Sequence, residues 1–155
     1  MNWEYIHLIS HPFAIVLPLV GAVVGIAGWI AQREQLERYG VLSILLGGIA
    51  ALPSYYSGIT AADDVTQRVF VAPGIVQDHR TWATWAAVLL VTSAIFAGYS
   101  LSQPKEPRLR RFVLLVGAGA ALLTALAAFR GGKIEHGEQS IDTDAPAAQI
   151  EQTLP

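Results

Sequence analysis

The stretch Trp82–Leu101, WATWAAVLLVTSAIFAGYSL, holds twenty residues without a formal charge. At about 1.5 Å of rise per residue, a helix of this length crosses the roughly 30 Å of hydrocarbon in a bilayer. We therefore predict a transmembrane helix over residues 82–101. Trp82 and Trp85 fall where an aromatic belt lies at a membrane interface, and Asp78-His79-Arg80-Thr81 precedes them. An ionisable cluster at the mouth of a span is typical of a site at one membrane face.

The composition of the whole chain is that of a small integral membrane protein. Of its 155 residues, 53% are hydrophobic and only 14% are charged, and the mean hydropathy is +0.44. Ordinary soluble domains carry about 25% charged residues. The net charge of −2 provides no basic surface for nucleic acid, and the chain lacks a glycine-rich phosphate-binding loop. Because cysteine is absent, thiolate metal sites and cysteine nucleophiles are excluded.

Three further apolar segments predict three more spans. The four predicted helices cover residues 12–31, 39–62, 82–101 and 112–129. Gly21, Gly25 and Gly28 fall on one face of the first helix, where a neighbouring backbone can approach closely. No ionisable side chain lies in the middle of any predicted span, which argues against a proton-driven transporter.

The order of these segments predicts the fold and its parts. We expect an all-α fold, an integral membrane four-helix up-down bundle with both termini on the same side. Residues 1–11 are predicted to form an outer head and residues 12–137 the transmembrane domain. Residues 138–155 form an acidic tail without Lys or Arg, which we expect to be mobile or to bind a partner.

Charge counts orient the predicted bundle. The two short turns, residues 32–38 and 102–111, carry six Lys and Arg side chains, while the remaining four are spread over far more chain. The positive-inside rule then places the turns in the cytoplasm. We expect a multi-pass protein of the bacterial inner membrane with both termini in the periplasm. The same alternation places every histidine of the chain on the outer side: His7, His11, His79 and His136.

This outer side has the residues that a b-type haem requires. Haem takes one or two imidazole ligands, an apolar slot, and cations near its propionates. The first and third helices of an up-down bundle are diagonal and parallel, so we expect His11 and His79 to face each other as an axial pair. His136 is an alternative ligand or propionate partner, and Arg80 and Arg130 supply positive charge. The predicted function is a redox-associated membrane subunit rather than an enzyme. His7 is expected to be solvated in the head.

Other functions remain open from the residues alone. A divalent metal would use His11, His79 and His136 together with carboxylates from Asp63, Asp64, Asp78 or Glu135. A quinone would bind a histidine and Tyr55 or Tyr56 beneath the headgroups. A non-catalytic accessory subunit of a larger respiratory or photosynthetic complex would bind no cofactor. It would attach to other membrane subunits through its small-residue helix faces, the apolar loop at residues 69–76 and the acidic tail.

Three short motifs occur together along the chain. They are His11-Pro12 with Pro18 downstream, His79 near the start of the third helix, and Gly131-Gly132 followed by His136-Gly137. In these motifs, Ile6–Gly137 resembles a bacterial four-helix membrane protein family of unknown function. Members typically carry a second His shortly after the His-Pro, where this chain has Val16, and a longer apolar step before the His-Gly. The resemblance implies a companion of respiratory or electron-transfer proteins.

Overall fold

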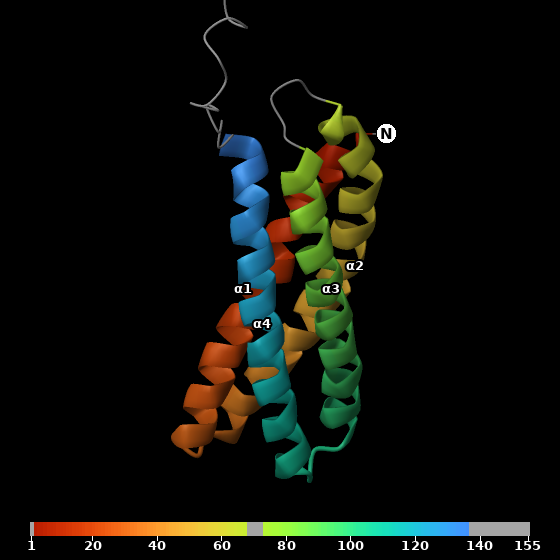
Figure 1. Ribbon diagram of the computed structural model, residues 1–155. Coiled ribbons are helices and arrows are strands. Elements are labelled where there is room, and N and C mark those ends of the chain that lie inside the picture. Colours follow the sequence, from red (N-terminus) through yellow and green to blue (C-terminus); the bar gives the residue numbers. More distant parts are fainter. Residues whose placement is uncertain (1, 68–72, 137–155) are drawn as a thin grey trace, which may run out of the picture.

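The computed structural model describes residues 2–67 and 73–136, apart from the side chains of Pro73, Lys133, Glu135 and His136. The chain forms four helices, which are α1 (Trp3–Ile30), α2 (Glu34–Thr66), α3 (Pro73–Ser102) and α4 (Pro107–His136). The α1–α2 hairpin lies against the α3–α4 hairpin and is inclined to it (Figure 1). All four helices are long and apolar enough to cross a membrane. The prediction of an all-α membrane four-helix bundle is confirmed.

Each helix is longer than the uncharged segment from which it was predicted. The side chain of Asn2 caps α1 by accepting a hydrogen bond from the Tyr5 backbone N–H at 3.1 Å, so residues 3–11 continue the helix instead of forming a head. Proline opens both α3 and α4, where a missing N–H costs nothing. Charge marks where a helix leaves the bilayer, but it does not end the backbone hydrogen bonding. The predicted tail at 138–155 lies outside the described residues.

The glycine face of α1 packs closely on α2. A Cβ atom built on Gly21 would lie 2.7 Å from the carbonyl oxygen of Gly40 and 2.7 Å from Cβ of Ser43. Only backbones in direct contact leave so little room, and this is how small residues let helices associate in a membrane. Farther inside the bundle, larger apolar side chains fill the space between the helices: Val41, Ile44, Leu90, Val113 and Leu114.

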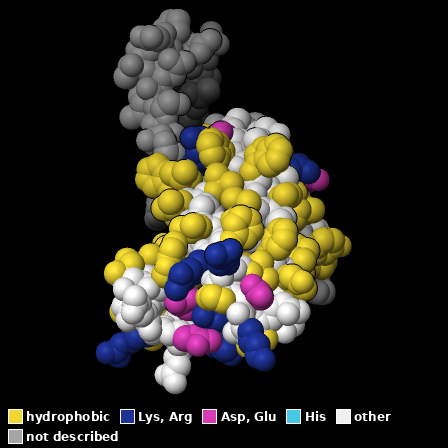
Figure 2. Space-filling model, turned by 90° about the horizontal axis from the view of Figure 1, so that it is seen from below, with side chains coloured by type: hydrophobic (Ala, Val, Ile, Leu, Met, Phe, Trp, Pro, Cys, Tyr) yellow, Lys and Arg dark blue, Asp and Glu magenta, His cyan; other side chains and the backbone are white. Residues whose placement is uncertain are grey.

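The two ends of the bundle differ in chemistry. At the turn end, formed by the α1–α2 and α3–α4 connections, Lys and Arg side chains gather among a few acidic ones (Figure 2). We call the other end the histidine end, because α1 and α3 begin there and α2 and α4 finish there (Figure 1). All four histidine positions therefore share one end, as predicted. Between the two ends, large apolar side chains face outward, such as Ile49, Ile95 and Leu122, which suits contact with lipid.

Candidate functional site

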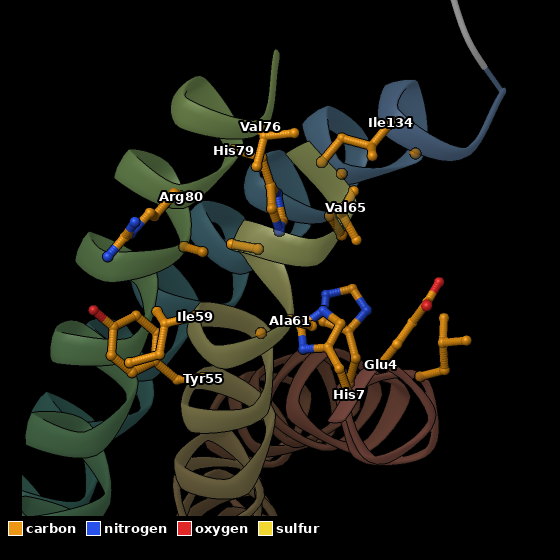
Figure 3. Close-up of a pocket in the computed structure, with 18 residues that line it drawn as sticks. Glu4, His7, Tyr55, Ile59, Ala61, Val65, Val76, His79, Arg80 and Ile134 are labelled. Carbon is orange, nitrogen blue, oxygen red and sulfur yellow. The ribbon is translucent and has the colours of Figure 1, made fainter. Parts of the chain in front are cut away.

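A pocket of about 370 Å³ opens among all four helices at the histidine end. This volume falls within the range of small-molecule and cofactor sites. Its walls are mostly Ala, Gly and aliphatic side chains, with a few polar groups placed among them (Figure 3). The polar groups are Glu4, His7, His11, Tyr55, His79 and Arg80.

His7 enters the pocket from α1 and is fixed by α2. Its Nδ1 atom lies 2.7 Å from the backbone carbonyl oxygen of Ser54. A carbonyl oxygen only accepts hydrogen bonds, so Nδ1 must carry a proton and donate it. In the neutral ring, Nε2 then keeps its lone pair. His7 was predicted to be a solvated residue of the head. The structure instead places it within α1, where its side chain is half-buried.

His79 repeats this arrangement on the other hairpin. It extends from α3, and its Nδ1 atom lies 2.8 Å from the backbone carbonyl oxygen of Ala127 on α4. The same argument leaves a lone pair on Nε2. His7 and His79 project toward each other from diagonal helices (Figure 3). A histidine that donates Nδ1–H to a backbone carbonyl while Nε2 stays available is the usual state of a metal-ligating imidazole.

A glycine follows each acceptor carbonyl by four residues. Gly58 follows Ser54, and Gly131 follows Ala127. Because helical Cβ atoms tilt toward the N-terminus, a side chain at that position would cover the acceptor carbonyl. A Cβ atom on Gly58 would lie 2.9 Å from Nδ1 of His7, and both glycines thus leave space for an imidazole. The fourth helix was predicted to end at residue 129, but α4 continues through Gly131 and Gly132 to His136.

His11 lies in the same pocket, one turn along α1 from His7. The two imidazole rings stack, with centroids 5.0 Å apart and planes inclined by 25°. Among the residues that the structure describes, none forms a hydrogen bond with the His11 ring. The structure therefore brings His11 and His79 to one site, as predicted, and adds His7 to them. His136 ends α4 at this end of the bundle, but its side chain lies outside the described residues.

The two predicted arginines have different surroundings. Arg130 forms an ion pair with Asp78, and its guanidinium carbon lies 4.6 Å from the centre of the Trp82 ring. These contacts join α4 to α3 beside His79. Arg80 lines the pocket, and within residues 2–67 and 73–136 its guanidinium group has no ion-pair or hydrogen-bond partner. Arg80 is exposed, and its guanidinium group points away from His7 and His79 (Figure 3), so it would reach an anionic group only at the edge of the pocket.

The divalent-metal and quinone alternatives depend on the carboxylates and tyrosines near the pocket. Within the described ranges, no three His, Asp or Glu side chains converge to hold a metal ion. The hydroxyl groups of Tyr55 and Thr84 lie 3.1 Å apart and join α2 to α3 at the pocket wall. Tyr55 therefore already has a partner inside the protein. Metal and quinone binding stay predictions.

The sequence did not identify His7 as a pocket residue. It also did not show that Gly58 and Gly131 leave space for the rings of His7 and His79. One signal was present, because His7 and His11 are four residues apart and therefore share a helix face if the helix begins before them. The glycine positions carried no such signal. Their meaning depends on which carbonyl groups lie four residues earlier and which side chains approach them from another helix.

The chain matches no protein-family model, and no curated protein and no solved structure is significantly similar to it.

Proposed function

We propose that this protein is a membrane electron-transfer subunit that binds b-type haem in the pocket at the histidine end, where His7 and His79 would hold the haem iron. The observation that carries the proposal is the matched pair of Nδ1-to-carbonyl hydrogen bonds, at 2.7 Å for His7 and 2.8 Å for His79. Each bond fixes the tautomer and the ring orientation before any ligand arrives. Metal-binding histidines almost always donate such a hydrogen bond from the ring nitrogen that does not bind the metal.

The two ligands come from helices that face each other across the bundle. A haem supplies one-electron redox chemistry at its iron, and the axial ligands and surrounding polarity tune it. His7 and His79 would hold the iron through Nε2, and the small side chains Ala61, Ala62, Ala83 and Ala128 leave room for a flat ring. Two protein ligands favour electron transfer over the binding of an exogenous ligand.

The cations have separate roles in this proposal. Arg80 would pair with a propionate carboxylate, because it lines the pocket without an internal partner among the described residues. Arg130 would act as a positioning residue, since its ion pair with Asp78 joins α4 to α3 next to the His79–Ala127 hydrogen bond. Neither His11 nor His136 is needed as a ligand.

The charge distribution supports an orientation. Six Lys and Arg side chains belong to the turn end and its flanking residues 32–38 and 102–111, which favours a cytoplasmic turn end. The haem would then lie near the outer face of a bacterial inner membrane, where it can exchange electrons with neighbouring membrane subunits.

The test is an absorption spectrum of detergent-purified protein from cells supplied with ample haem, recorded oxidised and after dithionite reduction. We expect a reducible Soret band and α band in the wild type. His7→Ala and His79→Ala should each remove the six-coordinate low-spin spectrum, and added imidazole should restore part of it. His11→Phe keeps the ring stacking and should retain the spectrum.

The same experiment distinguishes the main alternative. A folded, colourless wild-type protein from haem-replete cells would overturn the haem proposal and favour an accessory subunit without a cofactor. Loss of the spectrum in His11→Phe with retention in His7→Ala would show that the axial ligand on α1 is His11.

A further inference from the structure

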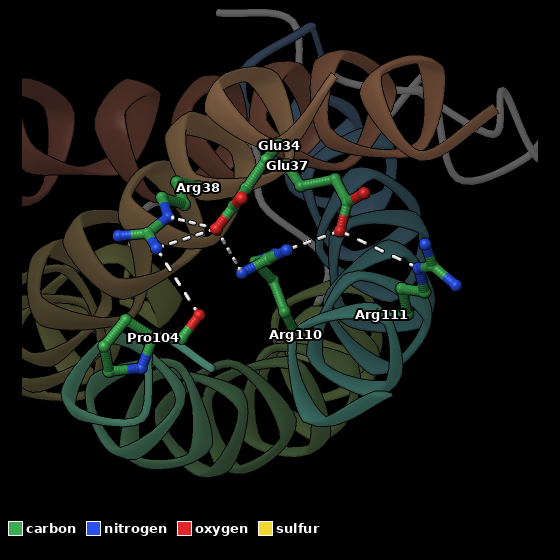
Figure 4. Close-up of polar contacts among 6 residues, drawn as sticks. All are labelled: Glu34, Glu37, Arg38, Pro104, Arg110 and Arg111. Atoms are coloured by element: carbon green, nitrogen blue, oxygen red, sulfur yellow. Dashed lines mark hydrogen bonds and ion pairs between the residues drawn. The ribbon is translucent and has the colours of Figure 1, made fainter. Parts of the chain in front are cut away.

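The turn end contains an ion network that leaves one positive charge in excess. Glu37 and Arg110 form its centre, with Arg110 Nε 2.9 Å from Glu37 Oε2 and side chains only 3% and 7% exposed. Glu34 joins Arg110 to Arg38, and Arg111 completes the network (Figure 4). Three guanidinium groups therefore face two carboxylates.

Arg111 carries the excess charge, because its contacts with the network are weak. Its Nε atom is buried without a hydrogen-bond partner, and it lies 3.8 Å from Glu37 Oε2. The two terminal nitrogens point away from the network (Figure 4). The side chain is 38% exposed, so these nitrogens are accessible from outside the bundle.

The Arg111 guanidinium is held in place from α1. Its central carbon lies 5.4 Å from the centre of the Trp29 ring, a cation–π contact between the end of α1 and the start of α4. A planar guanidinium that is fixed on one side and free on its outer edge suits a phosphate group, which it binds through two parallel hydrogen bonds.

An apolar row continues from Arg111 along the outside of α4. Leu115, Ala118 and Leu122 follow Arg111 at intervals of four, seven and eleven residues, which places them on one helix face. Leu115 is 53% exposed and Leu122 is 64% exposed. A free phosphate gains nothing from this row, whereas a phospholipid lays an acyl chain along it.

We propose that Arg111 and Trp29 bind the phosphate of an anionic phospholipid at the turn end, with one acyl chain lying along Leu115 and Leu122. The site is separate from the histidine pocket and does not depend on a haem. The excess positive charge of the network selects an anionic headgroup over a zwitterionic one, as basic sites between membrane helices do.

The test is native mass spectrometry of the full-length protein in detergent with added phosphatidylglycerol or phosphatidylcholine. We expect the wild type to retain phosphatidylglycerol over phosphatidylcholine. Arg111→Gln should lower phosphatidylglycerol retention by about fivefold or more, while Arg108→Gln should change it by less than about twofold. Arg108 is an exposed cation of the same helix turn and therefore a matched control.

Trp29→Leu provides an independent variant that leaves every charge in place, and it should also lower retention of phosphatidylglycerol. Helix content and melting temperature, measured by circular dichroism, show which variants are folded. Equal losses in Arg111→Gln and Arg108→Gln would overturn the proposal, as would equal retention of both lipids by the wild type. Displacement of the lipid by millimolar inorganic phosphate would assign Arg111 to a free anion instead.

Discussion

A Cβ atom built on Gly131 would lie 2.8 Å from Cε1 and 3.0 Å from Nδ1 of His79. The face of α4 is therefore open at the place where the imidazole reaches the carbonyl oxygen of Ala127. Gly58 has the same relation to His7 on the other hairpin. In each of the two hairpins, an imidazole donates to a backbone carbonyl beside a glycine. Helix packing alone does not require this arrangement to occur twice.

Replacing Gly131 by alanine should move the His79 ring away from its carbonyl acceptor. The expected loss in the free energy of haem binding is about 1–3 kcal/mol, or roughly 5- to 150-fold in haem affinity, measured by titrating haem into the apoprotein. Gly119→Ala is the matched control, because a Cβ atom there meets nothing within 4 Å and Gly119 does not line the pocket. Equal affinities of the two variants would contradict this role for Gly131.

Replacing Gly58 by alanine should act on His7 in the same way, although the two glycines lie on different hairpins. We expect the low-spin absorption spectrum to become partly high-spin, because one axial ligand is displaced while His79 stays in place. Gly119→Ala, at a helical position with open space around its Cβ, serves as the control. An unchanged spectrum in folded Gly58→Ala protein would contradict this role for Gly58.

The sequence was sufficient to predict the bundle, because a bilayer imposes its thickness on every span. Uncharged runs identified all four helices, and their alternation placed the histidines at one end. The glycine face of α1 was also predictable, since Gly21 and Gly25 share a helix face and α2 approaches it closely.

The details of the pocket were not predictable in the same way. His7 was assigned to a head because the first helix was predicted to begin at Pro12, whereas Asn2 caps α1 ahead of His7. The acceptor carbonyls of Ser54 and Ala127 belong to the backbone, so no residue type marks them. Which carbonyl groups the histidines reach depends on how the helices of each hairpin lie against each other, and a pattern of apolar residues does not predict this.

Arg80→Gln should lower the reduction potential of the bound haem without removing it. Arg80 lines the pocket, and a nearby positive charge favours the reduced iron, which carries one positive charge less. We expect a decrease on the order of 59 mV, equivalent to about 1.4 kcal/mol for one electron, in a spectroelectrochemical titration. Arg108→Gln removes the same charge at the turn end and should leave the potential nearly unchanged. A potential that is the same in both variants would show that Arg80 does not approach the cofactor.

Glu37→Leu should destabilise the bundle, because it leaves the buried guanidinium of Arg110 without its main partner. Removing one member of a buried pair typically costs about 3–5 kcal/mol, which should be measurable as a lower midpoint of unfolding in denaturant. Glu34→Gln is the comparison, since the Glu34 side chain is 55% exposed and its pairs are screened by solvent. If the pair acts through charge compensation, the double variant Glu37→Leu/Arg110→Leu should regain much of the lost stability. A double variant as unstable as Glu37→Leu alone would instead indicate that Glu37 acts through its packing or through Arg111, whose Nε lies 3.8 Å away.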